Sequence, residues 1–202
     1  GRGDGSAGEG AFEPELARFA VLLSLAGVGG MIYCGLAAIA QKDMKRMLAF
    51  SSVAHAGYLL TALVAAPGLA GEAMLFYLVA YATVNLGAFG AIAALSREGR
   101  EPFAIRDLHG LADRRPALAA ALTVFLVSLT GIPITAGFVG KFYLFGAAVA
   151  AGWVVLALVG VVMSVVSAYY YLRVVVAMYM RDPEGEDGWA VLSPASTFAL
   201  AV

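Results

Sequence analysis

The chain has 202 residues, of which 61% are hydrophobic and only 13% are charged, and its mean hydropathy is +0.85. Soluble globular domains are about 45–50% apolar, so this composition excludes that class and indicates an integral membrane protein. The formal net charge of −1 says little, because the placement of charges orients a membrane protein and their sum does not. Cys34 is the single cysteine, which excludes an intrachain disulfide and a CxxC-type metal or redox site. We expect no redox centre, bound metal, bound cofactor or nucleic-acid partner.

The two ends of the chain have the composition of loops. The start, GRGDGSAGEG, lacks an initiator methionine, a basic region and an apolar core, so residues 1–16 are predicted to be a polar loop and not a signal peptide. Residues 183–202 are predicted to be a loop followed by the start of a further transmembrane helix, because STFALAV opens a new apolar run. We therefore expect the chain to be an interior piece of a longer membrane protein.

Long apolar segments alternate with short polar ones between these ends. A helix that crosses a bilayer needs about 20 mostly apolar residues. Five segments meet this requirement, and they predict an all-α, polytopic transmembrane helical bundle: 18–40, 47–66, 72–95, 117–150 and 152–180.

The connections between these segments differ sharply in charge. Lysine and arginine occur at 41–46, 96–116 and 181–188, whereas the connections at 66–72 and 150–153 contain neither. The positive-inside rule then predicts a multi-pass membrane protein whose basic connections face the cytoplasm. At the end of the last span, the run Tyr169 to Tyr171 with Arg173 is predicted to form an interfacial aromatic belt and anchor.

The segment 117–150 is too long for one straight span. It would measure about 50 Å as a continuous helix, against a hydrocarbon core of about 30 Å. Gly131, Ile132 and Pro133 mark the expected break, because proline lacks the backbone donor and disfavours helical geometry in the residue before it. Backbone carbonyls freed at that depth need internal partners, so the break predicts a polar or hydrated interior.

Lys141 lies about two helical turns beyond this break, inside the apolar stretch GFVGKFYLF. One interpretation is that its long side chain extends to the membrane surface. The other is a functional role, since ionisable groups inside a membrane are candidate sites by default. A lysine ammonium can release and take up a proton, which an arginine guanidinium cannot do. We favour proton exchange at Lys141.

His55 and several hydroxyl or amide side chains are the other polar candidates within the spans. His55 is either a neutral histidine bonded to a neighbouring helix or a candidate proton relay, because histidine changes charge near neutral pH. The others are either helix–helix contacts or supports for a chain of water molecules: Tyr77, Tyr81, Asn85, Thr130 and Thr135.

Four stretches carry a family resemblance, in this order: QKDMKRMLAFSSVAHAGYLL, YATVNLGAFG, LTGIPITAGFVGKFYLF and SAYYYLRVVVAMYM. Together they resemble the antiporter-like, proton-translocating membrane subunits of NADH:quinone oxidoreductase, or respiratory complex I. Within that family the chain is most similar to subunit N, the counterpart of mitochondrial subunit 2. The resemblance covers nearly all of residues 17–182.

The resemblance implies that residues 17–182 form a proton-translocating domain equivalent to helices 9–13 of the family. This is the second half-channel and one five-helix unit of an inverted repeat with a broken helix. Lys141 matches the lysine that exchanges protons with the positive side, Gly131, Ile132 and Pro133 match the break, and His55 matches a histidine on the tenth helix of the family. The glutamate and the two further lysines of the first repeat have no match here, so this piece alone is not expected to pump.

The implied function is proton translocation coupled to electron transfer from NADH to quinone elsewhere in the complex. NADH, FMN, iron–sulfur clusters and quinone are then bound by other subunits, and the partners are the other membrane subunits and the lipid bilayer. Two alternatives remain open. The chain could belong to a multisubunit cation/proton antiporter or membrane-bound hydrogenase, or it could be a structural scaffold that does not pump.

Overall fold

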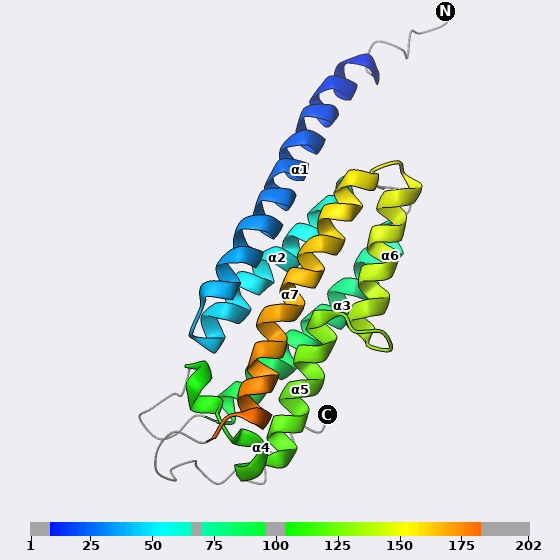
Figure 1. Ribbon diagram of the computed structural model, residues 1–202. Coiled ribbons are helices and arrows are strands. Elements are labelled where there is room, and N and C mark those ends of the chain that lie inside the picture. Colours follow the sequence, from blue (N-terminus) through cyan, green and yellow to red (C-terminus); the bar gives the residue numbers. More distant parts are fainter. Residues whose placement is uncertain (1–8, 66–69, 96–103, 183–202) are drawn as a thin grey trace, which may run out of the picture.

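The computed structural model describes residues 9–65, 70–95 and 104–182, and every regular element within these ranges is a helix. Figure 1 shows the long helices running alongside one another, with the N-terminal part of α1 projecting beyond the others. The predicted all-α bundle is confirmed. Its elements are α1 (Glu9–Ala40), α2 (Met44–Ala65), α3 (Ala70–Ala93), the 3₁₀ helix η1 (Ile105–Leu108), α4 (Leu111–Arg114), α5 (Pro116–Thr130), α6 (Ala136–Ala150) and α7 (Val154–Met180).

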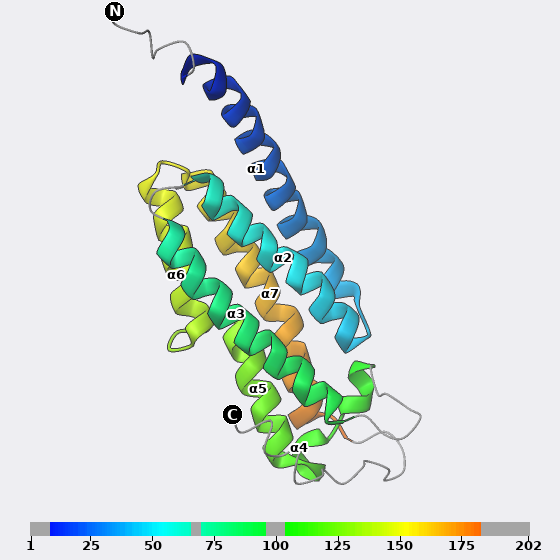
Figure 2. The ribbon, with the colours of Figure 1, turned by 180° about the vertical axis from the view of Figure 1, so that it is seen from behind.

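In the described part of the chain, three helices are long and apolar enough to cross a membrane, and they contain the ranges Arg18–Ala40, Gly71–Ala93 and Val154–Met180. The expected break in 117–150 is confirmed, because α5 and α6 have 15 residues each and are separated by residues 131–135. Both halves pack along α3, which lies on the near side of the bundle in Figure 2. The broken pair therefore takes the place of one long span.

The N-terminal boundary differs from the prediction. Residues 1–16 were expected to form a polar loop, but α1 already begins at Glu9. The stretch AFEPELARFA is polar enough to lie outside a bilayer and still consists largely of strong helix formers, so polarity alone did not exclude a helix. Residues 1–8 lie outside the described part of the chain.

The first basic connection is shorter than the predicted range 41–46, because only residues 41–43 separate α1 from α2. Helix α2 begins at Met44, and Asp43 acts as its N-cap, with a side-chain oxygen that accepts a hydrogen bond of 2.9 Å from the Arg46 backbone amide. The backbone amide of Ile105 donates to the carbonyl of Lys42 at 2.9 Å, so this turn is attached to the connection before α5. Lys42 and Arg106, one basic residue from each connection, therefore lie at the same end of the bundle.

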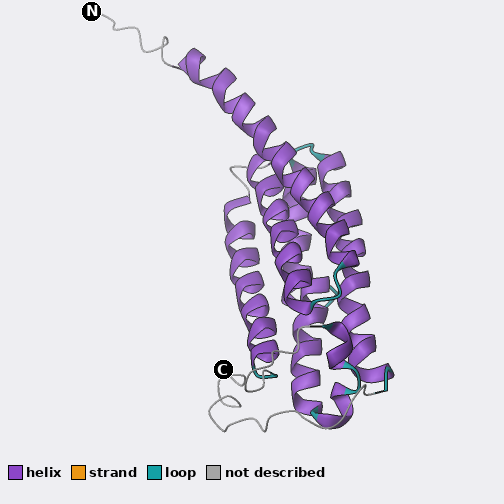
Figure 3. Cartoon of the chain, turned by 90° about the vertical axis from the view of Figure 1, so that its left-hand side faces the viewer, coloured by secondary structure: helices purple, strands orange, loops and turns teal. Residues whose placement is uncertain are grey.

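The other connections agree with the prediction only in part. The described part of 96–116 contains η1 and α4 and is not simply a loop, and Figure 3 shows these short helices at the end of the bundle. Of the connection 181–188, only residues 181 and 182 are described, and the further helix predicted within 183–202 lies outside the described residues.

The prediction of an interfacial aromatic belt is wrong for most of the residues assigned to it. Tyr169 is 60% exposed, but Tyr170 and Tyr171 are buried in the core. The guanidinium of Arg173 donates to the carbonyl oxygens of Ile39 at 2.7 Å and Gln41 at 2.8 Å, so it satisfies carbonyls at the C-terminal end of α1. Consecutive residues of a helix point in different directions, and a run of three tyrosines therefore cannot face one surface.

Candidate proton-transfer site

The site is built around the break between α5 and α6. Gly131 ends α5 in the left-handed conformation, with φ 84° and ψ 44°, a geometry that glycine adopts at little cost. Thr135 caps α6, because its hydroxyl oxygen accepts a hydrogen bond of 3.3 Å from the Phe138 amide. In a continuous helix the Leu129 carbonyl would bond to the amide of residue 133, but Pro133 has no N–H. The break thus leaves carbonyls at the end of α5 without helical donors.

Lys141 supplies the missing donors. Its side chain is only 4% exposed, and Nζ donates to the carbonyl oxygens of Leu129 at 3.0 Å and Thr130 at 3.1 Å. The third hydrogen bond goes to Oγ of Ser164 on α7, at 2.9 Å. An ammonium has three donors, so all three are satisfied, and the carbonyl end of a helix carries partial negative charge that stabilises a cation. This arrangement explains how a lysine is accommodated in an apolar segment.

The close approach of the two half-helices depends on Gly137. A Cβ atom at this position would collide with the carbonyl oxygen of Ser128 on α5. The backbone amide of Gly137 also lies 3.4 Å from the Ser128 hydroxyl. Glycine at 137 therefore lets the first turn of α6 pack directly against the last turn of α5.

The far side of the break faces outward. Ile134 is fully exposed and has a positive φ of 87°, which is unusual for a β-branched residue, and Ile132 is 37% exposed. The carbonyls at the break thus face the interior and contact Lys141, whereas the side chains of Ile132 and Ile134 point away from the described bundle.

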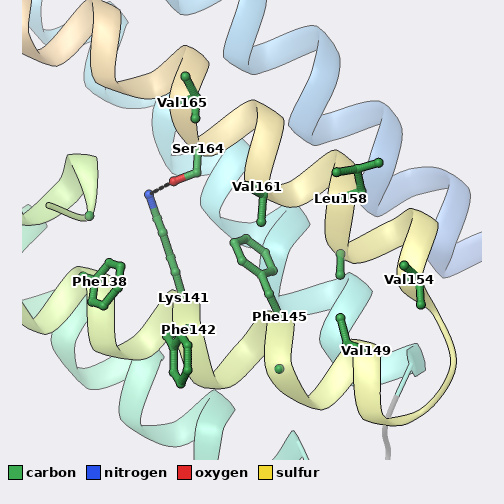
Figure 4. A pocket seen from close by; sticks show the side chains of 13 residues that line it. Phe138, Lys141, Phe142, Phe145, Val149, Val154, Leu158, Val161, Ser164 and Val165 are labelled. Carbon is green, nitrogen blue, oxygen red and sulfur yellow. Dashed lines mark hydrogen bonds between the residues drawn. The ribbon is translucent and has the colours of Figure 1, made fainter. Parts of the chain in front are cut away.

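An elongated hollow of about 540 Å³ extends from Lys141 between α6 and α7. Figure 4 shows Lys141 reaching across to Ser164 at one end, with aromatic and aliphatic side chains along the rest. Phe145 and Val161 belong to this apolar lining. The hollow is therefore polar only where the lysine meets the serine.

His55, on α2, belongs to a second cluster of buried polar side chains, to which α3 and α7 also contribute. It is 2% exposed, with Nδ1 at 2.5 Å from the hydroxyl of Tyr77 on α3 and Nε2 at 3.4 Å from the hydroxyl of Tyr171 on α7. The Tyr171 hydroxyl is also hydrogen-bonded to the hydroxyl of Ser51. The imidazole ring stacks on Tyr81, with centroids 4.7 Å apart. Four helical side chains thus form a continuous polar chain from Tyr77 to Ser51.

Tyr58 separates this chain from the lysine. Its ring centroid is 5.5 Å from Nζ of Lys141 and 5.4 Å from the centroid of the His55 ring. A cavity of about 10 Å³ lies between His55 and the end of α5, which is near the lower limit for one water molecule. Within the described residues, no hydrogen bond links Lys141 directly to His55, so the two polar groups are neighbours but not yet a connected path.

The other predicted polar residues have different surroundings. Tyr77 and Tyr81 contact His55, as described above. Thr130 contributes its carbonyl to Lys141, while its hydroxyl donates to the Leu126 carbonyl of its own helix at 2.8 Å. Thr135 is a helix cap, and Asn85 is half-buried on α3 with no hydrogen bond of its side chain among the described residues.

Three contributors were missed from the sequence: Ser164, Tyr171 and Tyr58. A usable signal existed for α7, because Ser164, Ser167 and Tyr171 are spaced by three and four residues in an otherwise apolar helix. Such spacing places side chains on one face. No cluster of His, Cys, Asp and Glu that could hold a metal ion occurs in the described ranges.

Known proteins share this arrangement of helices. The family described as NADH:quinone oxidoreductase/Mrp antiporter, transmembrane, matches residues 11–167. The chain belongs to this family. The family match covers nearly all of α1, then α2 to α6 and about half of α7, and so includes the break, Lys141 and His55.

Relatives within the family carry a consistent name. NADH-quinone oxidoreductase subunit N 1 of Solibacter usitatus is 44% identical over 191 residues, which is 94% of this chain and 39% of the relative. The subunit N 1 of Herpetosiphon aurantiacus is 46% identical over 95% of this chain and 37% of its own length. The chain thus spans about two fifths of the length of the curated relatives it matches.

Solved structures show the same fold. Respiratory complex I from Thermus thermophilus with bound aureothin contains a chain that is 35% identical, with a TM-score of 0.74 over 91% of this chain and 40% of that chain. The Mrp complex of a Dietzia species contains one that is 30% identical, with a TM-score of 0.76 over 84% of this chain and 32% of that chain. The fold is that of the antiporter-like membrane subunits of these assemblies.

Proposed function

We propose that this chain forms a proton-translocating half-channel in the membrane subunit N of an NADH:quinone oxidoreductase. The observation that carries the proposal is the placement of Lys141, whose ammonium is buried against two backbone carbonyls and one hydroxyl at a helix break. A group so placed can exist with and without its proton, since neither form is tied to a carboxylate among the described residues. We assign Lys141 the role of proton-exchange group.

The geometry disfavours the alternative in which Lys141 only anchors the helix at the membrane surface. Its side chain is buried in the bundle and directed at the end of α5, not at either end of α6. Burying an ammonium costs several kcal/mol even when it is well solvated by protein groups. A purely structural role would be served at lower cost by an apolar residue of similar length.

His55 and its tyrosines are proposed to connect Lys141 with the basic end of the bundle. Hydroxyl and imidazole groups can both donate and accept protons, and the hydrogen bonds run from Tyr77 through His55 and Tyr171 to Ser51. Ser51 lies about two turns from the start of α2 at that end. The contact with Tyr58 has to loosen, or admit water, before a proton can pass between His55 and Lys141.

The energy for transport is proposed to come from quinone reduction elsewhere in the assembly. The relatives named above are subunits of NADH-quinone oxidoreductases, which supports placing NADH, FMN, iron–sulfur clusters and quinone in partner subunits. The chain supplies one half-channel, so it is proposed to function only together with the remainder of its subunit and with other membrane subunits. We further propose that the basic end, with Lys42 and Arg106, faces the cytoplasm of a bacterial inner membrane.

A cation/proton antiporter remains the second candidate, and one observation favours it. The Mrp complex chain matches this fold with a TM-score of 0.76 at 30% identity. The higher identity to relatives named subunit N, at 44% and 46%, favours the oxidoreductase.

Replacing Lys141 with methionine tests the proposed function. The full-length subunit is studied in its intact assembly, reconstituted into vesicles, and NADH-driven quinone reduction and proton uptake are measured together. We expect Lys141→Met to abolish both activities, while Lys42→Met, which alters a lysine in an exposed turn, leaves them near the wild-type level. Wild-type pumping in the Lys141→Met assembly would overturn the proposal. Assembly without NADH-oxidising partners would favour the antiporter.

A further inference from the structure

The three acceptors around Lys141 are chemically unequal. Leu129 and Thr130 contribute backbone carbonyl oxygens, at 3.0 Å and 3.1 Å from Nζ, whereas Ser164 contributes a hydroxyl at 2.9 Å. A carbonyl oxygen can only accept a hydrogen bond, but a hydroxyl can accept one and donate one. The two kinds of partner therefore respond differently when the lysine loses its proton.

The number of protons on Nζ determines which kind of partner the lysine needs. The ammonium has three N–H bonds, and the three acceptors satisfy them all. After one proton leaves, the neutral amine has two N–H bonds and one lone pair. The two N–H bonds can stay on the carbonyls of Leu129 and Thr130, but the lone pair then needs a donor, and a buried polar atom without a partner is costly.

The elements packed around Lys141 offer one such donor. Helix α5 presents carbonyls, and α7 presents the Ser164 hydroxyl. Helix α2 presents the ring of Tyr58 at 5.5 Å and also carries His55, which is hydrogen-bonded to the hydroxyl of Tyr77 on α3. Among the described residues, no other hydroxyl is hydrogen-bonded to Nζ and no carboxylate is paired with it.

We propose that Ser164 is a positioning residue whose hydrogen bond with Lys141 reverses each time the lysine releases its proton. The inference rests on the proposed function. In the charged state Nζ–H donates to the serine oxygen. When that proton leaves Nζ for the next carrier, rotation about the serine C–O bond turns the hydroxyl hydrogen toward the nitrogen, and no covalent bond of Ser164 is broken. The amine therefore stays in place for the next proton.

This role accounts for a serine at position 164. Alanine would leave the neutral amine without a donor and the ammonium without its third acceptor. An aspartate would hold the ammonium as an ion pair and oppose proton release. Serine stabilises both states, and the hollow beside it gives its hydroxyl room to turn.

The test uses Ser164→Ala and Ser164→Thr in the full-length subunit within its assembly, reconstituted into vesicles. Threonine retains the hydroxyl and is the conservative rescue. Ser167→Ala is the matched control, because Ser167 is a buried serine one turn away that donates to the Ser164 carbonyl at 2.6 Å and does not contact Lys141. Proton translocation is measured as a function of pH, together with the amount of assembled complex.

We expect Ser164→Ala to lower the rate of translocation about tenfold and to shift the midpoint of its pH profile down by about one unit. The hydrogen bond that the charged ammonium loses is stronger than the one that the neutral amine loses, and a tenfold change in a proton equilibrium is one unit. Ser164→Thr should restore the wild-type profile, and Ser167→Ala should leave it unchanged. A loss of rate in Ser164→Ala with an unshifted profile, or no rescue by threonine, overturns the role of Ser164. Retained pumping in Lys141→Met instead overturns the proposed function, so the two failures can be distinguished.

Discussion

Nζ of Lys141 lies 3.0 Å from the carbonyl oxygen of Leu129, and this oxygen is the acceptor that Pro133 leaves without a helical donor. The lysine of one half-helix thus completes the hydrogen bonding of the other. Removing either the break or the ammonium leaves the remaining partner unsatisfied, so the two features depend on each other.

Restoring a continuous helix should impair transport although Lys141 is retained. We expect the double variant Gly131→Ala/Pro133→Ala to lower proton translocation at least about tenfold. Alanine at 133 regains an N–H that competes for the Leu129 carbonyl, and alanine at 131 disfavours the left-handed turn by about 1 kcal/mol. A Cβ atom at 131 would also lie 3.2 Å from Cδ of Lys141. Pro116→Ala, at the first position of α5, is the control; a pump unaffected by the double change would contradict the role of the break.

An arginine at position 141 should not replace the lysine. We expect Lys141→Arg to assemble normally and to translocate protons at less than about one tenth of the wild-type rate. A guanidinium can donate to the carbonyl oxygens of Leu129 and Thr130 in place of the ammonium, but it keeps its proton even above about pH 12. Proton uptake by reconstituted vesicles provides the measurement. Recovery of half or more of the wild-type rate would show that position 141 needs a positive charge and not an exchangeable proton.

Removing the imidazole of His55 should be less damaging than removing the amine of Lys141. We expect His55→Ala to retain a measurable fraction of pumping, because water can enter the vacated space and bridge Tyr77 and Tyr171. His109→Ala, which alters a histidine near the basic end, serves as the control. If His55→Ala were as inactive as Lys141→Met, the order of importance given to these two residues would be wrong.

The hydroxyl of Tyr171 links His55 to Ser51, and its removal should interrupt that connection. We expect Tyr171→Phe to slow proton translocation several-fold without a change in the amount of assembled complex, because the ring that packs in the core is kept. Tyr169→Phe removes a hydroxyl from a neighbouring tyrosine that is 60% exposed, and should have no effect. Equal rates in the two variants would exclude Tyr171 from the path.

The approach of α6 to α5 gives a prediction about stability. We expect Gly137→Ala to lower the thermal unfolding temperature of the detergent-solubilised subunit by several degrees, because the new methyl group would collide with the Ser128 carbonyl. Gly146→Ala is the matched control on the same helix, since a Cβ atom there meets nothing within 4 Å. Equal unfolding temperatures for the two variants would contradict the close contact at Gly137.

The sequence by itself determined the membrane class, the approximate ranges of the long helices and the break. These depend on local properties: apolar runs of sufficient length, a proline without an amide hydrogen, and a length of 34 residues that no single span accommodates, about 50 Å against about 30 Å. The sequence also marked Lys141, because an isolated cation in an apolar segment is visible without a structure. The roles assigned to Lys141 and His55 stay predictions.

Only the tertiary structure decided which groups surround these residues. Ser164 lies 23 positions from Lys141, and Tyr171 lies 116 positions from His55, so no local pattern pairs them. The tyrosine cluster was assigned to the membrane surface because its composition suits an interface, but the rotation of α7 about its axis buries Tyr170 and Tyr171 and leaves Tyr169 exposed. That rotation is set by packing against neighbouring helices, and packing is a property of the whole bundle.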